Sequence, residues 1–206
     1  MFSLLLRGFL LGFAVAASPG PIFFLCVRRT LTQGRLTGLF SGLGVATADG
    51  FYAAIATFGV AALTTAFVAG RRPLAVVGGV VLVLLGVRIL MERRQRMEAA
   101  PAVTPRSLAW AYVSTLGLTI TNPATIISFA ALAATLGLGT GGSLLRPALV
   151  VLGVLLGSAA WWIILVIGAS LLRARMTPAV VGWISTVSGL AIAVLGILAV
   201  IAAFSG

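Results

Sequence analysis

Charged residues are scarce in this chain, and those of negative sign are almost missing. Only 8% of its 206 residues are charged, whereas 61% are hydrophobic. A soluble domain of this length could not cover its surface with so few charges. The shortage of charge therefore excludes a soluble fold and indicates a chain that lies mainly within a lipid bilayer.

The chain also lacks the residue types on which most catalytic and metal sites depend. It has no histidine, one cysteine (Cys26) and three acidic residues, which are Asp49, Glu92 and Glu98. A Ser–His pair or a pair of carboxylates within the apolar segments, which hydrolytic chemistry would need, is absent from the sequence. The single cysteine excludes an internal disulfide. We therefore expect neither an enzyme nor a bound cofactor.

Long apolar segments are what the chain has in place of charge. A helix needs about 20 apolar residues to cross a bilayer. Six segments reach about that length, and they cover residues 8–31, 36–68, 73–91, 107–136, 147–172 and 178–204. We expect one all-α membrane domain over residues 1–206. The first segment continues through Val27, past a signal-peptide-like stretch, so we expect an uncleaved first span.

Arginine supplies all of the positive charge, and the net charge is +11. In a soluble protein this excess would suggest nucleic acid, but here most arginines lie between apolar segments. Nine lie in the connections after the first, third and fifth segments, and four lie on the opposite side. Cytoplasmic loops are enriched in arginine and lysine. We therefore expect no nucleic-acid partner, both termini outside, and the loop 92–106 in the cytoplasm.

The two halves of the chain show an internal repeat. The first repeat covers about residues 1–91, and the second about 107–206. Several glycines match at offsets of 109 and 110, namely Gly44 with Gly153, Gly59 with Gly168, Gly79 with Gly189, and Gly86 with Gly196. Three spans per half is an odd number, so the second half enters the membrane from the opposite side. The pattern predicts two inverted three-helix repeats, although glycine-rich helices also align by chance.

Each half has a proline break inside its first segment. The breaks are Ser18-Pro19-Gly20-Pro21 and Thr121-Asn122-Pro123. A broken helix survives in lipid only where protein or a wet cavity covers its freed backbone groups. Proline favours the first helical position, and Gly or Asn suits the position before it. Each break therefore predicts a helix N-terminus that can bind a carboxylate, with a simple packing kink as the alternative.

Asp49 is the only acidic residue inside an apolar segment, and it lies midway along the second one. An ionised Asp at the bilayer centre costs about 3 kcal/mol on insertion scales, so it must face the bundle interior, water or a partner. It could hold a substrate ammonium group, carry a proton, or do both in turn. The structural alternative is a hydrogen bond to the opened backbone of a broken helix. Tyr52, one helical turn later, could hydrogen-bond the carboxylate or the substrate.

Two helix N-termini and one carboxylate together suit a zwitterion. The helix termini would take its carboxylate, and Asp49 would take its amine. The predicted binding or coupling site therefore consists of Pro19, Gly20, Pro21, Asp49, Tyr52, Asn122 and Pro123. This prediction assumes that the three elements meet in space.

Other residues have less specific interpretations. Arg28 and Arg29 are expected to extend to the cytoplasmic surface, and the alternative is that they attract anionic solutes at the entrance. Trp162 lies in the middle of the fifth segment, where it could line a substrate cavity or pack in the core.

At these residues the chain resembles the lysine exporter family of bacterial translocators, the LysE or RhtB type, over nearly its whole length. The motifs that carry the resemblance are Pro19-Gly20-Pro21, Gln33-Gly34-Arg35, Gly38, Gly42-x-Gly44, Asp49 and Asn122-Pro123. The resemblance implies a six-segment exporter of the bacterial inner membrane that moves amino acids or similar solutes out of the cell. It also implies coupling to protons, as in an antiporter, and a homodimer.

The chain departs from the family pattern after the second break. Family members often have a basic residue there, followed by an aromatic pair, whereas this chain has Ala124 and then Ile127-Ser128-Phe129. The substrate preference of family members therefore cannot be assigned to this chain. A metal-cation exporter of the same fold is the alternative function, although metals prefer several carboxylate, thiolate or imidazole ligands. We favour amino-acid export by alternating access over this alternative and over a membrane scaffold without transport.

Overall fold

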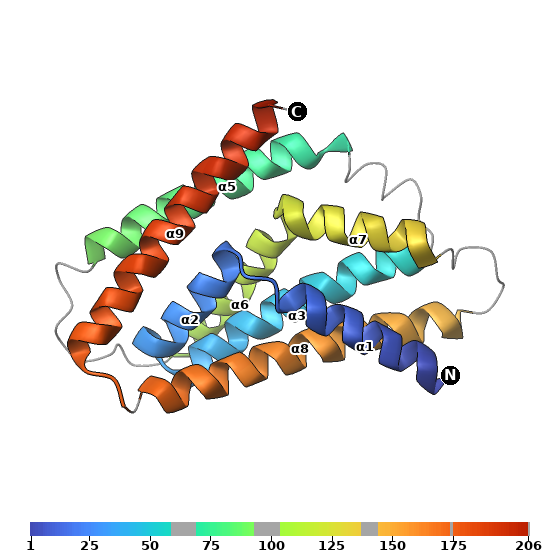
Figure 1. Ribbon diagram of the computed structural model, residues 1–206, viewed down its shortest axis with the longest axis horizontal. Coiled ribbons are helices and arrows are strands. Elements are labelled where there is room, and N and C mark those ends of the chain that lie inside the picture. Colours follow the sequence, from blue (N-terminus) through green and yellow to red (C-terminus); the bar gives the residue numbers. More distant parts are fainter. Residues whose placement is uncertain (59–68, 93–103, 137–143, 174, 206) are drawn as a thin grey trace.

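The computed structural model describes residues 1–58, 69–92, 104–136, 144–173 and 175–205, and the regular elements in these ranges are all helices. Figure 1 shows their arrangement. The helices are α1 (Phe2–Ala16), α2 (Pro21–Gln33), α3 (Arg35–Thr57), α5 (Arg71–Glu92), α6 (Pro105–Ile120), α7 (Pro123–Leu136), α8 (Leu145–Arg173) and α9 (Pro178–Ser205).

Four of these helices, α3, α5, α8 and α9, are each long and apolar enough to cross a membrane. The other two candidate spans are bent pairs. The bend is 81° between α1 and α2, and 62° between α6 and the Ala124–Ala131 part of α7. The described residues thus contain four to six candidate spans, which confirms the predicted all-helical membrane fold. The predicted end of the second segment, residues 59–68, lies outside the described residues.

The bends occur where the prolines predict them. Helix α2 begins at Pro21 and α7 begins at Pro123. Proline has no N–H and clashes with the preceding turn when it lies inside a helix, but neither problem arises at the first position. The chain therefore ends one helix and starts another at each break.

Glycines let the backbones of α1 and α8 approach closely. Gly8 and Gly12 of α1 pack directly against the backbone of Val150 and Val154, and Gly157 of α8 packs against that of Phe9. A side chain at any of these positions would force the helices apart. Helix α3 lies between α8 and α6, so these helices form the centre of the bundle (Figure 1).

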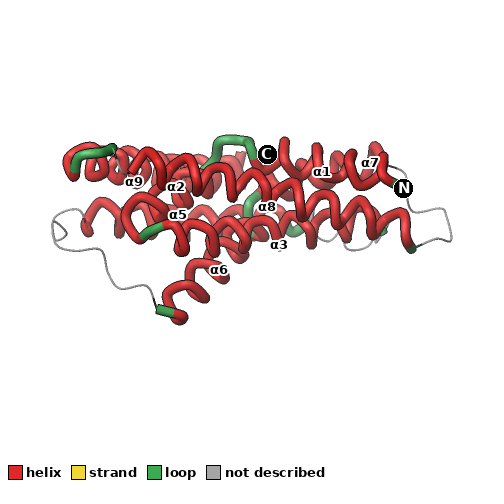
Figure 2. Tube along the Cα trace, turned by 90° about the horizontal axis from the view of Figure 1, so that it is seen from below, coloured by secondary structure: helices red, strands yellow, loops and turns green. Residues whose placement is uncertain are grey.

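Helices α5 and α9 form a pair beside this centre (Figure 1). Gly79 of α5 packs against the backbone of Gly196, and Gly86 packs against that of Gly189. The pair reaches the rest of the bundle mainly through contacts between α9 and α2. Figure 2 shows α6 inclined away from the other helices.

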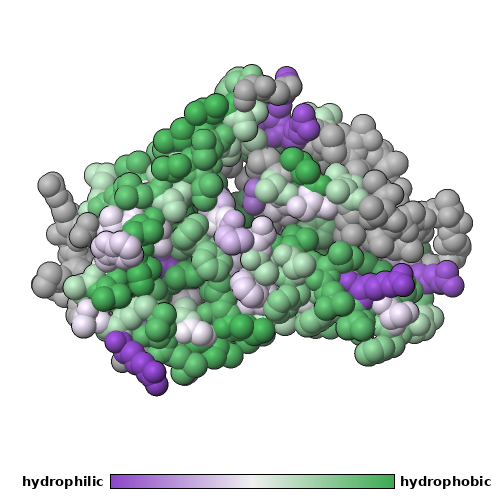
Figure 3. All heavy atoms as spheres, viewed as in Figure 1, coloured by the Kyte–Doolittle hydropathy of each residue, from purple (hydrophilic) through white to green (hydrophobic). Residues whose placement is uncertain are grey.

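The ends of α2, α5 and α8 lie at the left end of the molecule in Figure 1, and the N-terminus lies at the right end. Much of the outer surface is hydrophobic (Figure 3). An apolar exterior of this kind suits contact with lipid acyl chains, and the polar groups that carry function are therefore expected inside.

Candidate functional site

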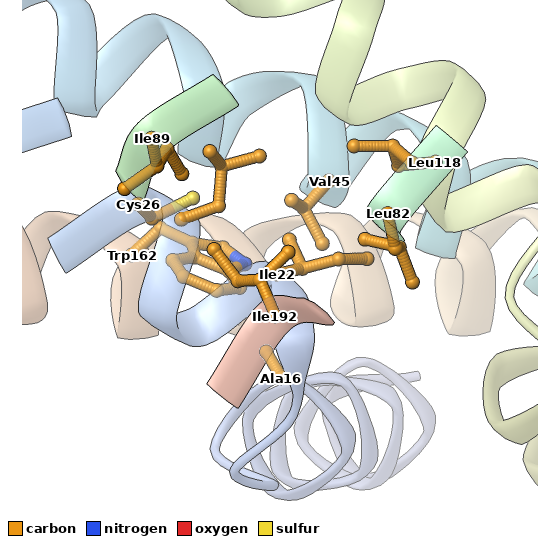
Figure 4. Close-up of a cluster of buried hydrophobic side chains, with 10 residues drawn as sticks. Ala16, Ile22, Cys26, Val45, Leu82, Ile89, Leu118, Trp162 and Ile192 are labelled. Atoms are coloured by element: carbon orange, nitrogen blue, oxygen red, sulfur yellow. The ribbon is translucent and has the colours of Figure 1, made fainter. Parts of the chain in front are cut away.

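Residues that flank both breaks belong to one hydrophobic cluster in the centre of the bundle (Figure 4). Ala16 ends α1, Ile22 is the second residue of α2, and Leu118 lies near the end of α6. Val45 of α3, one helical turn before Asp49, belongs to the same cluster. The cluster therefore connects residues next to both breaks with Val45 in the middle of α3.

The register between α2 and α3 relates the start of α2 to the middle of α3 by height along the two helices. The two helices meet at Gly34, and Gly38 of α3 packs directly against Thr30 of α2. Both helices rise by the same distance per residue, about 1.5 Å. Nine residues before Thr30 is Pro21, and nine residues after Gly38 is Thr47, so the count relates Pro21 to Thr47 in height along the helices.

Asp49 itself is buried, with 2% of its surface exposed. Its Oδ2 atom accepts a hydrogen bond of 2.7 Å from the Ser158 hydroxyl of α8. The carboxyl is therefore bonded to α8 rather than to either broken helix. The hydroxyl is a neutral donor, so this hydrogen bond brings no charge to the carboxyl. The arrangement suits a carboxyl group that gains and loses a proton or a cationic ligand.

Ser158 was not among the predicted site residues. Its residue type gives no signal, because serine is common in membrane helices and often bonds its own backbone. Its position, however, lies 109 residues after Asp49, the offset that relates Gly44 to Gly153. The repeat alignment therefore contained the signal.

Tyr52 satisfies the backbone at the second break. Its hydroxyl donates a hydrogen bond to the carbonyl of Ile120, the last residue of α6. Its ring stacks on Phe129 of α7, with 5.9 Å between the ring centroids. Tyr52 thus contacts both halves of the broken span, and its hydroxyl proton goes to a freed carbonyl rather than to a carboxylate.

The two predicted helix N-termini differ in how they are capped. The Asn122 side chain accepts a hydrogen bond of 3.1 Å from the N–H of Ala124, so α7 has a side-chain cap. Gly20, the residue just before α2, has no side chain to cap the helix, and its backbone is extended with φ of −154°. A Cβ atom at Gly20 would meet nothing within 4 Å. The α2 terminus is therefore the more open of the two.

The surface near the start of α2 is less apolar than the rest of the molecular surface in this view. Ser18 and Pro19 are exposed, and Gly20 and Pro21 are half-buried. Figure 3 shows pale, less hydrophobic atoms in the middle of the face on which Figure 1 shows the connection between α1 and α2. A polar ligand could approach the α2 terminus from this side.

Trp162 offers a further donor in the same region. The indole is 3% exposed and lies near Ile22 and Cys26 in the central cluster (Figure 4). Within the part of the chain that the structure describes, its N–H has no hydrogen-bond partner. A buried donor without a partner is costly, and a ligand that accepted its hydrogen bond would recover that cost.

Arg28 and Arg29 correct the expectation that they extend to the surface. They are only 8% and 5% exposed. Arg28 donates to the Ser185 hydroxyl of α9 at 3.0 Å. Arg29 donates to Ser41 of α3, and to the Ala111 carbonyl and the Ser114 hydroxyl of α6. These oxygens replace water for the guanidinium groups, so the side chains stay inside the bundle.

The described residues contain no group of three or more His, Cys, Asp or Glu side chains that could hold a metal ion. The chemistry of the site therefore depends on one carboxyl group, one open helix terminus and neutral donors.

Comparison with known proteins identifies a family and a relative that the chain resembles. Residues 13–203 match the family model described as LysE type translocator. The uncharacterized membrane protein YahN of Escherichia coli (strain K12) is 32% identical over 114 residues, which are 54% of this chain and 51% of that protein. The alignment thus spans about half the length of this relative. No solved structure matches the chain.

Proposed function

The chain belongs to the LysE type translocator family, and from this premise we propose that it exports amino acids or similar small zwitterionic solutes in exchange for protons. Members of this family are membrane transporters of small solutes rather than enzymes, which confirms the expectation for this chain. The substrate class, the coupling ion and the site residues are the parts that we propose.

The observation that carries the proposal is the buried carboxyl of Asp49, which is bonded to Ser158 of α8. The open start of α2 and the register of α2 with α3 support the proposed position of the solute carboxylate. In this arrangement Asp49 holds the amine of the solute. The N–H groups at the start of α2 and the N–H of Trp162 hold its carboxylate. The α7 terminus contributes less than the sequence predicts, because Asn122 already occupies one of its donors.

Protonation of Asp49 provides the coupling. The ionised carboxylate attracts an ammonium group, and a proton on the carboxyl removes that attraction. A proton that arrives from outside therefore releases the solute, and departure of the proton towards the cytoplasm restores the site. Solute and proton compete for one carboxyl group, which makes the protein an antiporter.

Reciprocal contacts support the inverted repeats that alternating access needs. In the repeat alignment, Gly79 corresponds to Gly189 and Gly86 corresponds to Gly196. In the structure the contacts are crossed, because Gly79 packs against Gly196 and Gly86 packs against Gly189. Asp49 and Ser158 are counterparts that bond to each other. Contacts of this kind are what a two-fold relation between the halves would give. We infer that the halves move against each other around the Asp49–Ser158 pair.

We place the protein in the bacterial inner membrane with both termini outside and as a homodimer. The orientation is supported by the arginine-rich ends of α2 and α8, which lie at the same end of the molecule. The homodimer is supported by the family resemblance alone.

Flux measurements in proteoliposomes test this function and separate it from metal export. With an outward-directed solute and an inward-directed proton gradient, we expect an amino acid from a panel of the standard twenty to leave the vesicles. Dissipating the pH gradient should slow this efflux. Divalent metal ions should not move faster than in protein-free vesicles. Metal flux without flux of any amino acid would overturn the proposal in favour of the metal-exporter alternative.

A further inference from the structure

A cavity of about 240 Å³ lies between the later parts of α2 and α5 and the start of α6. Leu25, Arg28 and Arg29 form its α2 side, and Trp110 and Ala111 form its α6 side. Helices α2 and α5 end at the left end of the molecule in Figure 1, which is the end that we expect to face the cytoplasm. A solute that leaves the cytoplasm would therefore reach this cavity first.

The inner wall of the cavity belongs to the central hydrophobic cluster. Leu25 lines the cavity and is also a member of the cluster, together with Cys26 and Val45. Leu25 is 2% exposed, and Cys26 is fully buried. Val45 lies one helical turn before Asp49 on α3. Packed apolar side chains therefore extend from the cavity towards Asp49, and a solute in the cavity cannot pass them in this conformation.

Two arginines at the cavity join α2 to the second half of the chain. Arg29 donates to the Ser114 hydroxyl at 2.9 Å and to the Ala111 carbonyl at 3.0 Å, and both acceptors belong to α6. Arg28 donates to the Ser185 hydroxyl of α9 at 3.0 Å. Helix α2 is thus bonded to two helices of the other half at the level of the cavity.

Helix α2 also has a backbone break at each end. It begins at Pro21, and it ends at Gly34, whose φ of +99° lies in the region that favours glycine. Helix movements are absorbed by a few residues at the ends of elements. The two breaks therefore allow α2 to move as a unit once its bonds to α6 and α9 open.

We propose that Arg28 and Arg29 are positioning residues of export, which close the path from the cavity to Asp49 by holding α2 against α6 and α9. We call the bonds from these arginines to α6 and α9 the α2 gate. The inference rests on the proposed function and adds the element that moves. When the gate bonds break, α2 moves away from α6, and the solute passes from the cavity to Asp49. Neutral oxygen acceptors suit such a contact, because water replaces them when the path opens.

Cys26 allows the gate to be tested without an added label site. It is the only cysteine of the sequence, it is fully buried, and it lies three residues before Arg29. Its thiol reacts with a maleimide only when the reagent reaches it. If opening and closing are fast, the rate of labelling follows the population of the open state. We expect slow labelling of the unmodified protein by a charged, membrane-impermeant maleimide, measured by mass spectrometry.

Two variants are expected to open the gate. Ser114→Ala removes an acceptor of Arg29 and should raise the labelling rate of Cys26 about tenfold. Ser114→Thr keeps a hydroxyl at this position and should restore the slow rate. Ser185→Ala removes an acceptor of Arg28 and should change the labelling rate in the same direction as Ser114→Ala.

Ser128→Ala is the matched control for these variants. Ser128 is exposed on α7, and its hydroxyl bonds a carbonyl of its own helix. The control should therefore label like the unmodified protein. Unchanged labelling in both gate variants, or equal acceleration in Ser128→Ala, would overturn the proposal.

The side from which Cys26 is labelled separates gate opening from a general loosening of the bundle. Arg175→Cys, in a chain that also carries Cys26→Ala, marks the arginine-rich end, because Arg175 is exposed just after α8. Spheroplasts and inside-out vesicles expose opposite faces of the membrane to the reagent. In Ser114→Ala, Cys26 should react only in the preparation in which the marker reacts. Labelling from both sides, or from the opposite side alone, would contradict the gate.

The gate and the proposed function fail separately, because labelling needs neither solute nor a proton gradient. Faster, one-sided labelling of Ser114→Ala in a protein that moves no amino acid would keep the gate and remove the proposed function. Efflux that depends on Asp49, in a protein whose Ser114→Ala variant still labels slowly, would remove the gate and keep the proposed function.

Discussion

Asp49→Asn is expected to reduce proton-driven solute efflux to the level of protein-free vesicles. Asn has nearly the same shape, and its carbonyl oxygen can still accept the hydrogen bond from Ser158, but it cannot carry a charge or exchange a proton. The substitution also removes the cost of a charge inside the membrane. We therefore expect normal insertion and an unchanged or slightly higher melting temperature, measured in detergent.

Three comparisons sharpen this result. Glu92→Gln makes the same chemical change at the end of α5, where it should leave efflux unchanged. Ser158→Ala removes the donor to Asp49 but keeps the carboxyl, so it should slow efflux without abolishing it. Solute–solute exchange without a pH gradient should also be lost in Asp49→Asn, because the carboxyl holds the amine as well as the proton. Full proton-driven efflux in Asp49→Asn would end the assignment of this residue.

Gly20→Asp is expected to abolish solute binding while the protein remains folded. The extended backbone at Gly20 accepts any residue, and no atom lies within 4 Å of a Cβ placed there. Asp at this position would cap α2 and interact favourably with its N-terminus, by about 0.3–1 kcal/mol. Its carboxylate would then occupy the donors that we assign to the carboxylate of the solute.

The matched variant is Gly20→Asn, which has the same shape without the charge. This variant gives the first break an asparagine just before its proline, as Asn122 does at the second break. Its effect on solute affinity, measured by equilibrium binding, should be smaller than that of Gly20→Asp. If Gly20→Asp binds solute as well as the unmodified protein, the start of α2 is only a packing kink. A large loss of thermal stability in both variants would point to the same conclusion.

The sequence predicts the helices and their breaks well because both depend on local properties. Apolar length decides which segments cross a bilayer, and a proline decides where a helix starts even when tertiary contacts are unknown. Pro21 and Pro123 accordingly begin α2 and α7 as expected. The pairing of Asp49 with Ser158 was also within reach, because the glycine offset relates the two positions.

Other features depend on contacts between distant segments and could not be read from residue types. Arginines near the end of an apolar segment usually extend to the surface. Nothing in the local sequence shows that Arg28 bonds Ser185 inside the bundle, or that Arg29 bonds Ser41 and Ser114 there. The unequal caps of the two broken helices follow from Gly at one break and Asn at the other. The sequence does not show, however, that the start of α2 is the more open of the two, because this depends on the empty space around Gly20.

Proton release on solute binding tests the central claim most directly, because the claim is that solute and proton compete for Asp49. The measurement uses the purified protein in weakly buffered solution with a pH indicator, and a solute identified in the flux panel. We predict that binding releases up to one proton per solute, with more release as the pH is lowered, because more of the carboxyl is then protonated. Asp49→Asn should release none. Solute binding without proton release at every pH, or equal release from Asp49→Asn, would contradict the account.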